Sequence, residues 1–179
     1  MEIFAAPRVL IVGAGSMGLI VGYHLSLART DVTFLVRPGS FKRLDRPQVL
    51  YCYDDNSLKQ FDRYAVISDH GAIAGGRYDY IVITLDGASM QNEAGIELTK
   101  AIGKAAQGTD TKVILGSVFF DSRRWFQSMS GLPEEQFANG FLRSTPTRQV
   151  PSPSRSTSRP IRTCLPRRIW LTPIAWATA

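Results

Sequence analysis

Apolar runs of four to six residues alternate with helical patterns over the first two thirds of the chain. The runs are rich in branched and aromatic side chains and end at glycine, proline or a polar residue, which is typical of buried strands. The clearest are predicted to be strands at Arg8–Val12, 31–36, 80–85, and Lys112–Leu115 continued by 118–120 after a break at Gly116 and Ser117. Weaker patterns at 49–53 and 64–67 predict two shorter strands.

Between these strands, apolar residues recur at helical spacing. Such spacing predicts a helix directly after Gly18 and a long amphipathic helix over residues 88–106. A short helical turn and loop is expected at 71–77, a helix or loop at 123–129, and a helix start at 132–135. Alternating strands and helices indicate βαβ units, so we predict an α/β fold whose doubly wound, mostly parallel sheet is covered on both faces.

The composition changes sharply at Arg143. Residues 1–142 carry 14 Lys+Arg against 15 Asp+Glu, whereas residues 143–179 carry seven Arg and no acidic residue. The excess of positive charge that gives the chain its net +6 is therefore confined to residues 143–179, a segment dominated by arginine, proline, serine and threonine. We predict one folded domain over 1–142 and a disordered tail over 143–179. An arm that binds nucleic acid is the alternative interpretation of the tail, and its composition favours disorder without such a partner.

A glycine motif follows the first predicted strand and opens the first predicted helix. Its pattern is Gly13-x-Gly15-x-x-Gly18, with Ala14, Ser16 and Met17 between the glycines. In this context the three glycines permit a tight turn, a close approach of a pyrophosphate, and close packing of helix on strand. The motif predicts a Rossmann-type dinucleotide site, with the phosphates held at the helix N-terminus. The alternative is a glycine-rich turn without a ligand.

Arg37 ends the second predicted strand, where an acidic residue would select NAD. A guanidinium there suits the 2′-phosphate of NADP instead, and Lys42 and Arg43 add charge nearby. We therefore predict NADP as the cofactor. A solvated arginine without a ligand is the alternative at this position.

Residues 8–37, 78–87 and 112–118 resemble the N-terminal domain of the ketopantoate reductases, and the resemblance extends over about residues 8–140. It implies a Rossmann domain that binds NADPH and a helical second domain that supplies a catalytic lysine and a substrate-binding glutamate. It also implies hydride transfer to the ketone of ketopantoate. By matching positions, residues 13–18 would take the pyrophosphate and Arg37 the 2′-phosphate.

The chain departs from that family at two strand ends. Asp86 stands where the family usually has lysine, and Ser117-Val118 stands where it usually has Asn-Gly. Leu85, Asp86 and Ser117 are predicted to contact the cofactor, because ligands bind at the carboxyl ends of strands in doubly wound sheets. Asp86 could equally cap the following helix, and Ser117 could equally be a turn residue. A divergent member with another 2-keto acid as substrate is expected.

The family's second domain has no counterpart that we recognise after residue 142, and no catalytic residue is assigned. We expect an incomplete or divergent member, with a truncation or a shifted reading frame near 142–143 and binding without turnover. A non-catalytic dinucleotide-binding module or sensor is the second hypothesis.

Other candidate features favour structural roles. Residues 9–28 lack formal charge but are broken by four glycines, so neither a membrane span nor a signal peptide is expected. Cys52 and Cys164 form no disulfide or zinc pattern, which indicates a cytoplasmic setting.

No metal site is predicted: the run from Asp54 through Asp55 and Asn56 favours a turn. His24 and His70 favour packing or surface positions.

Overall fold

The computed structural model describes residues 5–53, 55–116, 119 and 121–139. Its central sheet has six strands in the order β5-β2-β1-β6-β7-β8, and every neighbouring pair is parallel. The strands are β1 (Arg8–Val12), β2 (Asp31–Leu35), β5 (Ala65–Ile67), β6 (Tyr80–Ile83), β7 (Lys112–Leu115) and β8 (Phe137–Asn139). This topology is that of a Rossmann-type doubly wound sheet and confirms the predicted fold class.

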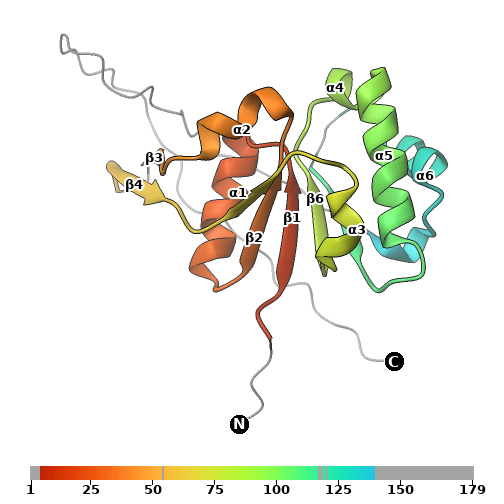
Figure 1. Ribbon diagram of the computed structural model, residues 1–179, viewed down its shortest axis with the longest axis horizontal. Helices are drawn as coiled ribbons and strands as arrows, with labels where there is room; N and C mark the ends of the chain where they lie inside the picture. The colour runs from red at the N-terminus through yellow and green to blue at the C-terminus, as the bar shows by residue number, and fades with distance from the viewer. Residues whose placement is uncertain (1–4, 54, 117–118, 120, 140–179) are drawn as a thin grey trace.

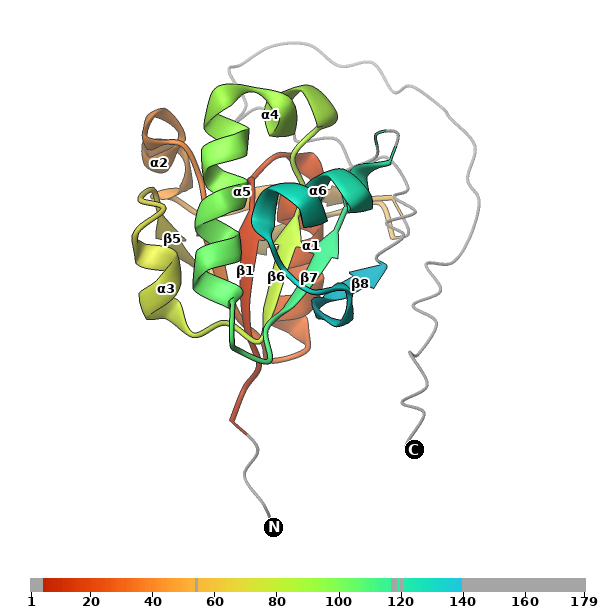
Figure 2. The same cartoon turned by 90° about the vertical axis from the view of Figure 1, so that its right-hand side faces the viewer.

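Helices lie on both faces of the sheet, as Figures 1 and 2 show. One face carries α1 (Ser16–Leu27), with α2 (Pro38–Leu44) beside it. The other carries α3 (Ala72–Gly76), α5 (Glu93–Ala106) and α6 (Ser122–Ser130), while α4 (Gly87–Gln91) precedes α5 above the strand ends. A parallel sheet needs this arrangement, because the crossover helices bury both of its faces.

The core is divided by the sheet into two apolar clusters. Alternate residues of β1 supply both: Leu10 and Val12 face the α5 side, while Val9 and Ile11 face the α1 side. Leu10 and Ile11 have no exposed surface, so the strand is buried on both faces and reads as a continuous apolar run. Burial of each such side chain stabilises the fold by about 1.5–3 kcal/mol.

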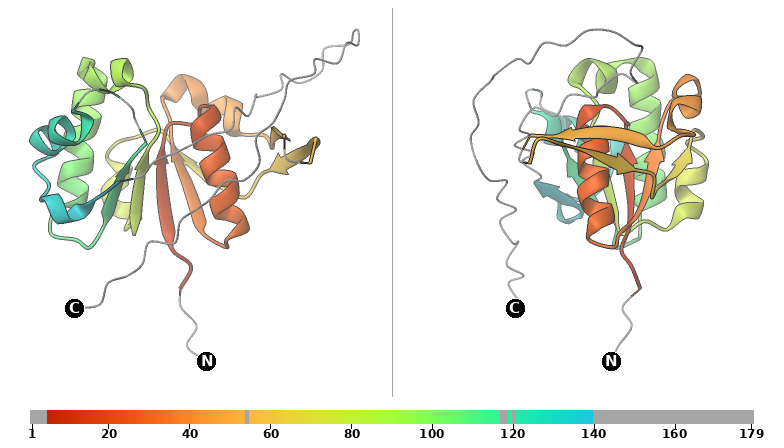
Figure 3. Two further views of the ribbon diagram at one scale, coloured as in Figure 1. Left: turned by 180° about the vertical axis from the view of Figure 1, so that it is seen from behind. Right: turned by 90° about the vertical axis from the view of Figure 1, so that its left-hand side faces the viewer.

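A two-stranded antiparallel hairpin is inserted between α2 and β5. It comprises β3 (Gln48–Cys52) and β4 (Ser57–Phe61), and it crosses α1 on the side away from the sheet (Figure 3). Phe61 anchors it through edge-to-face contacts with Tyr23 of α1 and Phe34 of β2, at centroid distances of 5.9 and 6.1 Å. The sequence predicted the first of these strands and missed the second, as it also missed α2.

Three expectations for residues 88–136 need correction. The single helix predicted over 88–106 is two helices, because Asn92 is extended and caps α5. Phe119 lies in a bend and does not extend β7. The segment expected to start a helix at 132–135 makes only a short 3₁₀ turn, η1 (Glu134–Gln136), and then enters β8.

Some predictions fall outside the described part of the chain. The tail at 143–179, Ser117, Val118 and Asp54 are among these residues. Within the described ranges, none of the helices combines the length and the apolar character that a membrane crossing requires.

Candidate functional site

Four strands of the sheet end at the same level, and the glycine loop emerges there. The register pairs Val12 with Leu35 and Ile83, and Ile83 with Leu115, so β1, β2, β6 and β7 present their carboxyl ends along one edge. The chain order reverses between β1 and β6. A crevice at such a switch point is where doubly wound sheets bind ligands.

The turn out of β1 depends on the first and last glycines of the motif. Gly13 has a φ of +100°, which a residue with a side chain rarely adopts, and its N–H donates to the Leu35 carbonyl at 3.0 Å. A Cβ on Gly18 would collide with the Gly13 carbonyl oxygen. The backbone therefore folds back tightly on itself, and α1 begins close against the strand.

Gly15 has a different environment, because a Cβ placed there would meet nothing within 4 Å. It is the exposed N-cap residue of α1, which has no side-chain cap and no acidic residue in its first turn. Among the described residues, no acceptor binds the N–H groups of Ser16 and Met17. The open space and the free donors at a twelve-residue helix fit an anionic group.

Thr84, which no sequence motif marks, contacts the glycine loop. It follows β6, and its hydroxyl donates to the Val12 carbonyl at 2.9 Å and lies 3.2 Å from the Gly13 carbonyl oxygen. Its own N–H also donates to Val12, at 3.0 Å. Its place directly after the apolar run at 80–83 was the available sequence signal. No local pattern links this threonine to a loop 71 positions earlier.

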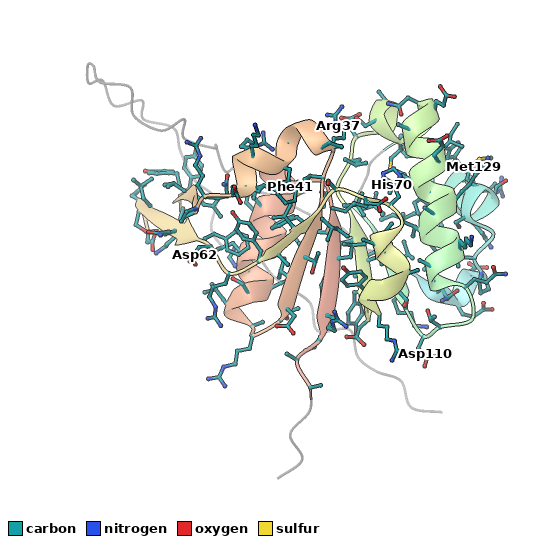
Figure 4. The ribbon with its side chains drawn as sticks, viewed as in Figure 1. Arg37, Phe41, Asp62, His70, Asp110 and Met129 are labelled. Carbon is teal, nitrogen blue, oxygen red and sulfur yellow. The ribbon has the colours of Figure 1, made fainter. Side chains whose placement is uncertain are left out.

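Arg37 lies where the sequence predicts it, at the carboxyl end of β2. It is the extended N-cap residue of α2, and Pro38 occupies the first turn of that helix. Its side chain is exposed, and among the described residues no hydrogen bond or ion pair holds it. Figure 4 shows it at the edge where the strands end, far from Asp110 at the opposite edge.

A second arginine reaches the glycine loop directly. Arg43, near the end of α2, donates from Nη2 to the Ala14 carbonyl at 2.9 Å. Its guanidinium therefore adds positive charge beside the loop, as the sequence suggested. Lys42, on the same helix, is exposed.

Asp86 caps α4, which is the alternative that the sequence left open. Its carboxylate accepts from the Ser89 N–H at 2.7 Å and from the Ser89 hydroxyl at 3.1 Å. These two bonds hold the pKa of Asp86 below its ordinary value, and the bond from the Ser89 backbone N–H has the larger effect. Its contact with a cofactor stays a prediction. Leu85 packs beside Gly13, since a Cβ on that glycine would lie 2.9 Å from Leu85 Cδ2.

The remaining polar candidates lie apart from the loop. Asp55 accepts from the Ser57 N–H and hydroxyl and pairs with Lys59, and Asn56 has a φ of +52°, so this segment is a hairpin turn. Within the described residues, no three potential ligands gather to hold a metal ion. His24 is exposed on α1, and His70 is exposed in the turn after β5.

A cavity of about 490 Å³ lies at the other end of the sheet from the glycine loop. Its lining includes Tyr78, Asp79, Thr111 and Lys112, at the amino ends of β6 and β7. A second cavity of about 350 Å³ lies between α2 and β5, lined by Phe41, Asp62 and Tyr64 among others. Neither of these cavities is lined by the loop.

A model of the family described as ketopantoate reductase PanE/ApbA matches residues 9–121. The match covers more than half of the chain and includes the glycine loop, Arg37 and Thr84. The chain belongs to the ketopantoate reductase family. The resemblance inferred from the sequence is thereby confirmed. No curated protein sequence matches this ketopantoate reductase family member significantly.

Solved structures share the fold of this ketopantoate reductase family member. D-mandelate dehydrogenase with NADH and anilino(oxo)acetate aligns with a TM-score of 0.59 at 13% identity, over 74% of this chain and 40% of its own. An Enterococcus faecalis protein assigned as a 2-dehydropantoate 2-reductase gives 0.56 at 18% identity, over 74% and 40%. The 2-dehydropantoate 2-reductase from Methylococcus capsulatus gives 0.52 at 16%, over 68% and 36%. The chain thus spans well under half the length of these proteins.

Proposed function

We propose that this chain binds NADP(H) at the glycine loop and is the cofactor-binding part of an oxidoreductase of the ketopantoate reductase type. The observation that carries the proposal is the open space at Gly15 beside the uncapped start of α1. Anions are stabilised at such a helix start by free N–H groups and by the helix dipole. Family membership and a structural relative solved with NADH support a nicotinamide dinucleotide as the anion.

The preference for NADP over NAD rests on Arg37. Its guanidinium is exposed at the end of β2 and, within the described residues, has no partner to compete with a phosphate. A planar fork of donors pairs well with phosphate oxygens. Arg43, fixed on the Ala14 carbonyl, adds positive charge on the same side of the loop.

Bound NADPH would supply the hydride that reduces a 2-keto acid to the corresponding 2-hydroxy acid. Residues 13–18 of this chain would hold the pyrophosphate and Arg37 the 2′-phosphate. Leu85 and Asp86, which follow β6, would also contact the cofactor. Asp86 is not suited to donate a proton, because its hydrogen bonds to Ser89 keep its pKa low. The catalytic acid is therefore not assigned to it.

The capping role of Asp86 also favours a second candidate function. Both carboxylate oxygens of Asp86 accept hydrogen bonds from Ser89 and so cap α4. This residue stands where the family usually has a lysine. A non-catalytic module that binds or senses the dinucleotide would not need the lysine that the family usually has at this position. The two candidates share the same cofactor site and differ only in turnover.

Titration of the full chain with NADPH, followed by a turnover assay with a panel of 2-keto acids, separates these functions. Binding with oxidation of NADPH supports the oxidoreductase. Binding without oxidation supports the module. Failure to bind either NADPH or NADH would contradict both.

Replacing Arg37 by alanine should weaken NADPH binding by between about tenfold and a hundredfold, since hydrogen bonds to charged groups contribute about 1.5–3 kcal/mol. NADH has no 2′-phosphate, so its dissociation constant should hardly change. Both constants can be measured by quenching of intrinsic fluorescence. Arg63→Ala is the matched control, because it removes the same charge from an exposed position between β4 and β5. Equal affinity of the Arg37 variant and the wild type for NADPH would contradict the preference for NADP.

A further inference from the structure

Three consecutive carbonyl groups at the end of β1 are held by donors from other elements. The Val12 carbonyl accepts from the N–H and the hydroxyl of Thr84, and the Gly13 carbonyl lies within hydrogen-bond distance of the same hydroxyl. The Ala14 carbonyl accepts from Arg43. The loop is therefore held from β6 on one side and from α2 on the other.

Holding these carbonyls sets the direction of the N–H groups. In a planar trans peptide the C=O of one residue points opposite to the N–H of the next. A Gly13 carbonyl directed at Thr84 thus turns the Ala14 N–H away from Thr84. An Ala14 carbonyl directed at Arg43 turns the Gly15 N–H away from Arg43. Within the described residues, neither N–H has an acceptor.

The Thr84 hydroxyl also lies between the two ends of the glycine motif. A Cβ on Gly13 would lie 3.1 Å from Thr84 Oγ1, and a Cβ on Gly18 would lie 2.9 Å from it. The space that these glycines leave is thus filled by a hydroxyl group that can donate its proton to the loop. A side chain of the same shape without a donor would fill the space but would remove the hydroxyl bonds to the loop, leaving only the backbone N–H of residue 84 on the Val12 carbonyl.

We propose that Thr84 is a positioning residue whose hydroxyl holds the glycine loop in the conformation that receives the dinucleotide phosphates. The proposal rests on the proposed function, because it concerns how the same site is prepared for its ligand. Thr84 acts through the backbone of Val12 and Gly13, not by touching the cofactor. Its contribution is preorganisation: the donors need not be reoriented when the phosphate arrives.

The test compares Thr84→Val, which keeps the shape and removes the donor, with Thr84→Ser, which keeps the donor. Thr111→Val is the matched control, because the Thr111 hydroxyl donates to the Tyr78 carbonyl at 2.7 Å at the opposite end of the same sheet. Three quantities are measured on the full chain: the dissociation constant for NADPH, the melting temperature, and amide hydrogen exchange of the peptide that contains Gly13–Gly18.

Thr84→Val should weaken NADPH binding by about tenfold, the effect expected from one lost hydrogen bond in the site. Its loop peptide should exchange faster in the free protein, and Thr84→Ser should restore both quantities. Thr111→Val should lower the melting temperature while leaving the NADPH dissociation constant and the exchange of the loop unchanged. If Thr84→Val does not fold, Thr84→Ala and Thr84→Ser form the decisive pair.

Two outcomes would overturn the proposal while the proposed function stands. One is wild-type affinity in the valine variant. The other is an equal loss of affinity in Thr84→Val and Thr111→Val, which would mean that general destabilisation causes the effect. Failure of the wild type to bind any nicotinamide dinucleotide would overturn the proposed function, and this proposal with it.

Discussion

The three glycines of the loop are required for three different physical reasons. Gly13 adopts a positive φ, and Gly18 lets α1 approach a backbone carbonyl. Gly15 has no such constraint from the protein, since its missing Cβ points into open space. A glycine that the fold does not need is best explained by a ligand that approaches it.

Gly15→Ala should therefore separate binding from stability. The added methyl group touches no protein atom, so the free energy of unfolding should stay close to that of the wild type. NADPH binding should weaken by about tenfold or more, equivalent to about 1.4 kcal/mol, because the methyl group occupies the approach of the phosphate. Urea denaturation and NADPH titration measure the two effects.

Gly75→Ala is the control for this substitution. Gly75 lies in α3, is exposed, and likewise leaves open space for a Cβ. Its replacement should change neither NADPH affinity nor, beyond a small gain in helix propensity, stability. Unchanged NADPH affinity in Gly15→Ala would argue against a phosphate at this position.

At the scale of elements, the boundary between α4 and α5 shows where periodicity misleads. Apolar residues keep helical spacing across it, and the sequence therefore predicts one helix. Asn92 breaks the helix by taking an extended conformation, and its side chain accepts from the Gly95 N–H at 2.9 Å. Gly95 then packs against the carbonyls of Ser89 and Met90. An asparagine followed by an acidic residue is a helix-start signal that the longer apolar pattern outweighed.

Asn92→Ala should destabilise the protein by about 1 kcal/mol, because α5 loses its side-chain cap. Asn92→Asp should retain most of the stability, since a carboxylate also caps and interacts favourably with the helix N-terminus. Urea denaturation of both variants, with Gln91→Ala as an exposed neighbouring control, measures the effect. Equal stability of the alanine variant and the wild type would contradict the contribution of this cap.

The hairpin β3–β4 shows a second limit at this scale. β3 carries a recognisable apolar run, whereas three of the five residues of β4 are polar and it has a single buried aromatic, Phe61. Only the contacts of Phe61 with Tyr23 and Phe34 reveal why this strand is held against α1. Those partners lie 38 and 27 positions away along the chain.

At the scale of the whole molecule, Gln136 joins the last strand to the rest of the fold. Its buried side-chain amide donates to the carbonyls of Ala106, Thr109 and Thr111, at distances of 2.9, 2.8 and 3.1 Å. These carbonyls belong to the connection between α5 and β7. The turn before β8 is thereby fixed where the strand can pair with β7.

Gln136→Met should destabilise the protein by about 1–3 kcal/mol, because the substitution leaves buried carbonyls without their donor. Gln60→Met, at an exposed position of β4, serves as the control and should have little effect. Urea denaturation gives the two free energies of unfolding. In the Gln136 variant, the amide hydrogens of β8 should also exchange faster than they do in the wild type, while those of the central strand β1 change less. An equal change in both strands would contradict this role.

The sequence by itself determined the α/β class, the glycine loop between β1 and α1, and the position of Arg37. These features depend on local patterns: burial on both faces makes strands continuously apolar, and a tight phosphate-binding turn requires glycine at fixed spacing. The tertiary structure decided which residues surround that loop and which residue joins the last strand to the rest of the fold. Thr84, Arg43 and Gln136 act through hydrogen bonds to carbonyls 71, 29 and 25–30 positions away, and no local periodicity records such pairings.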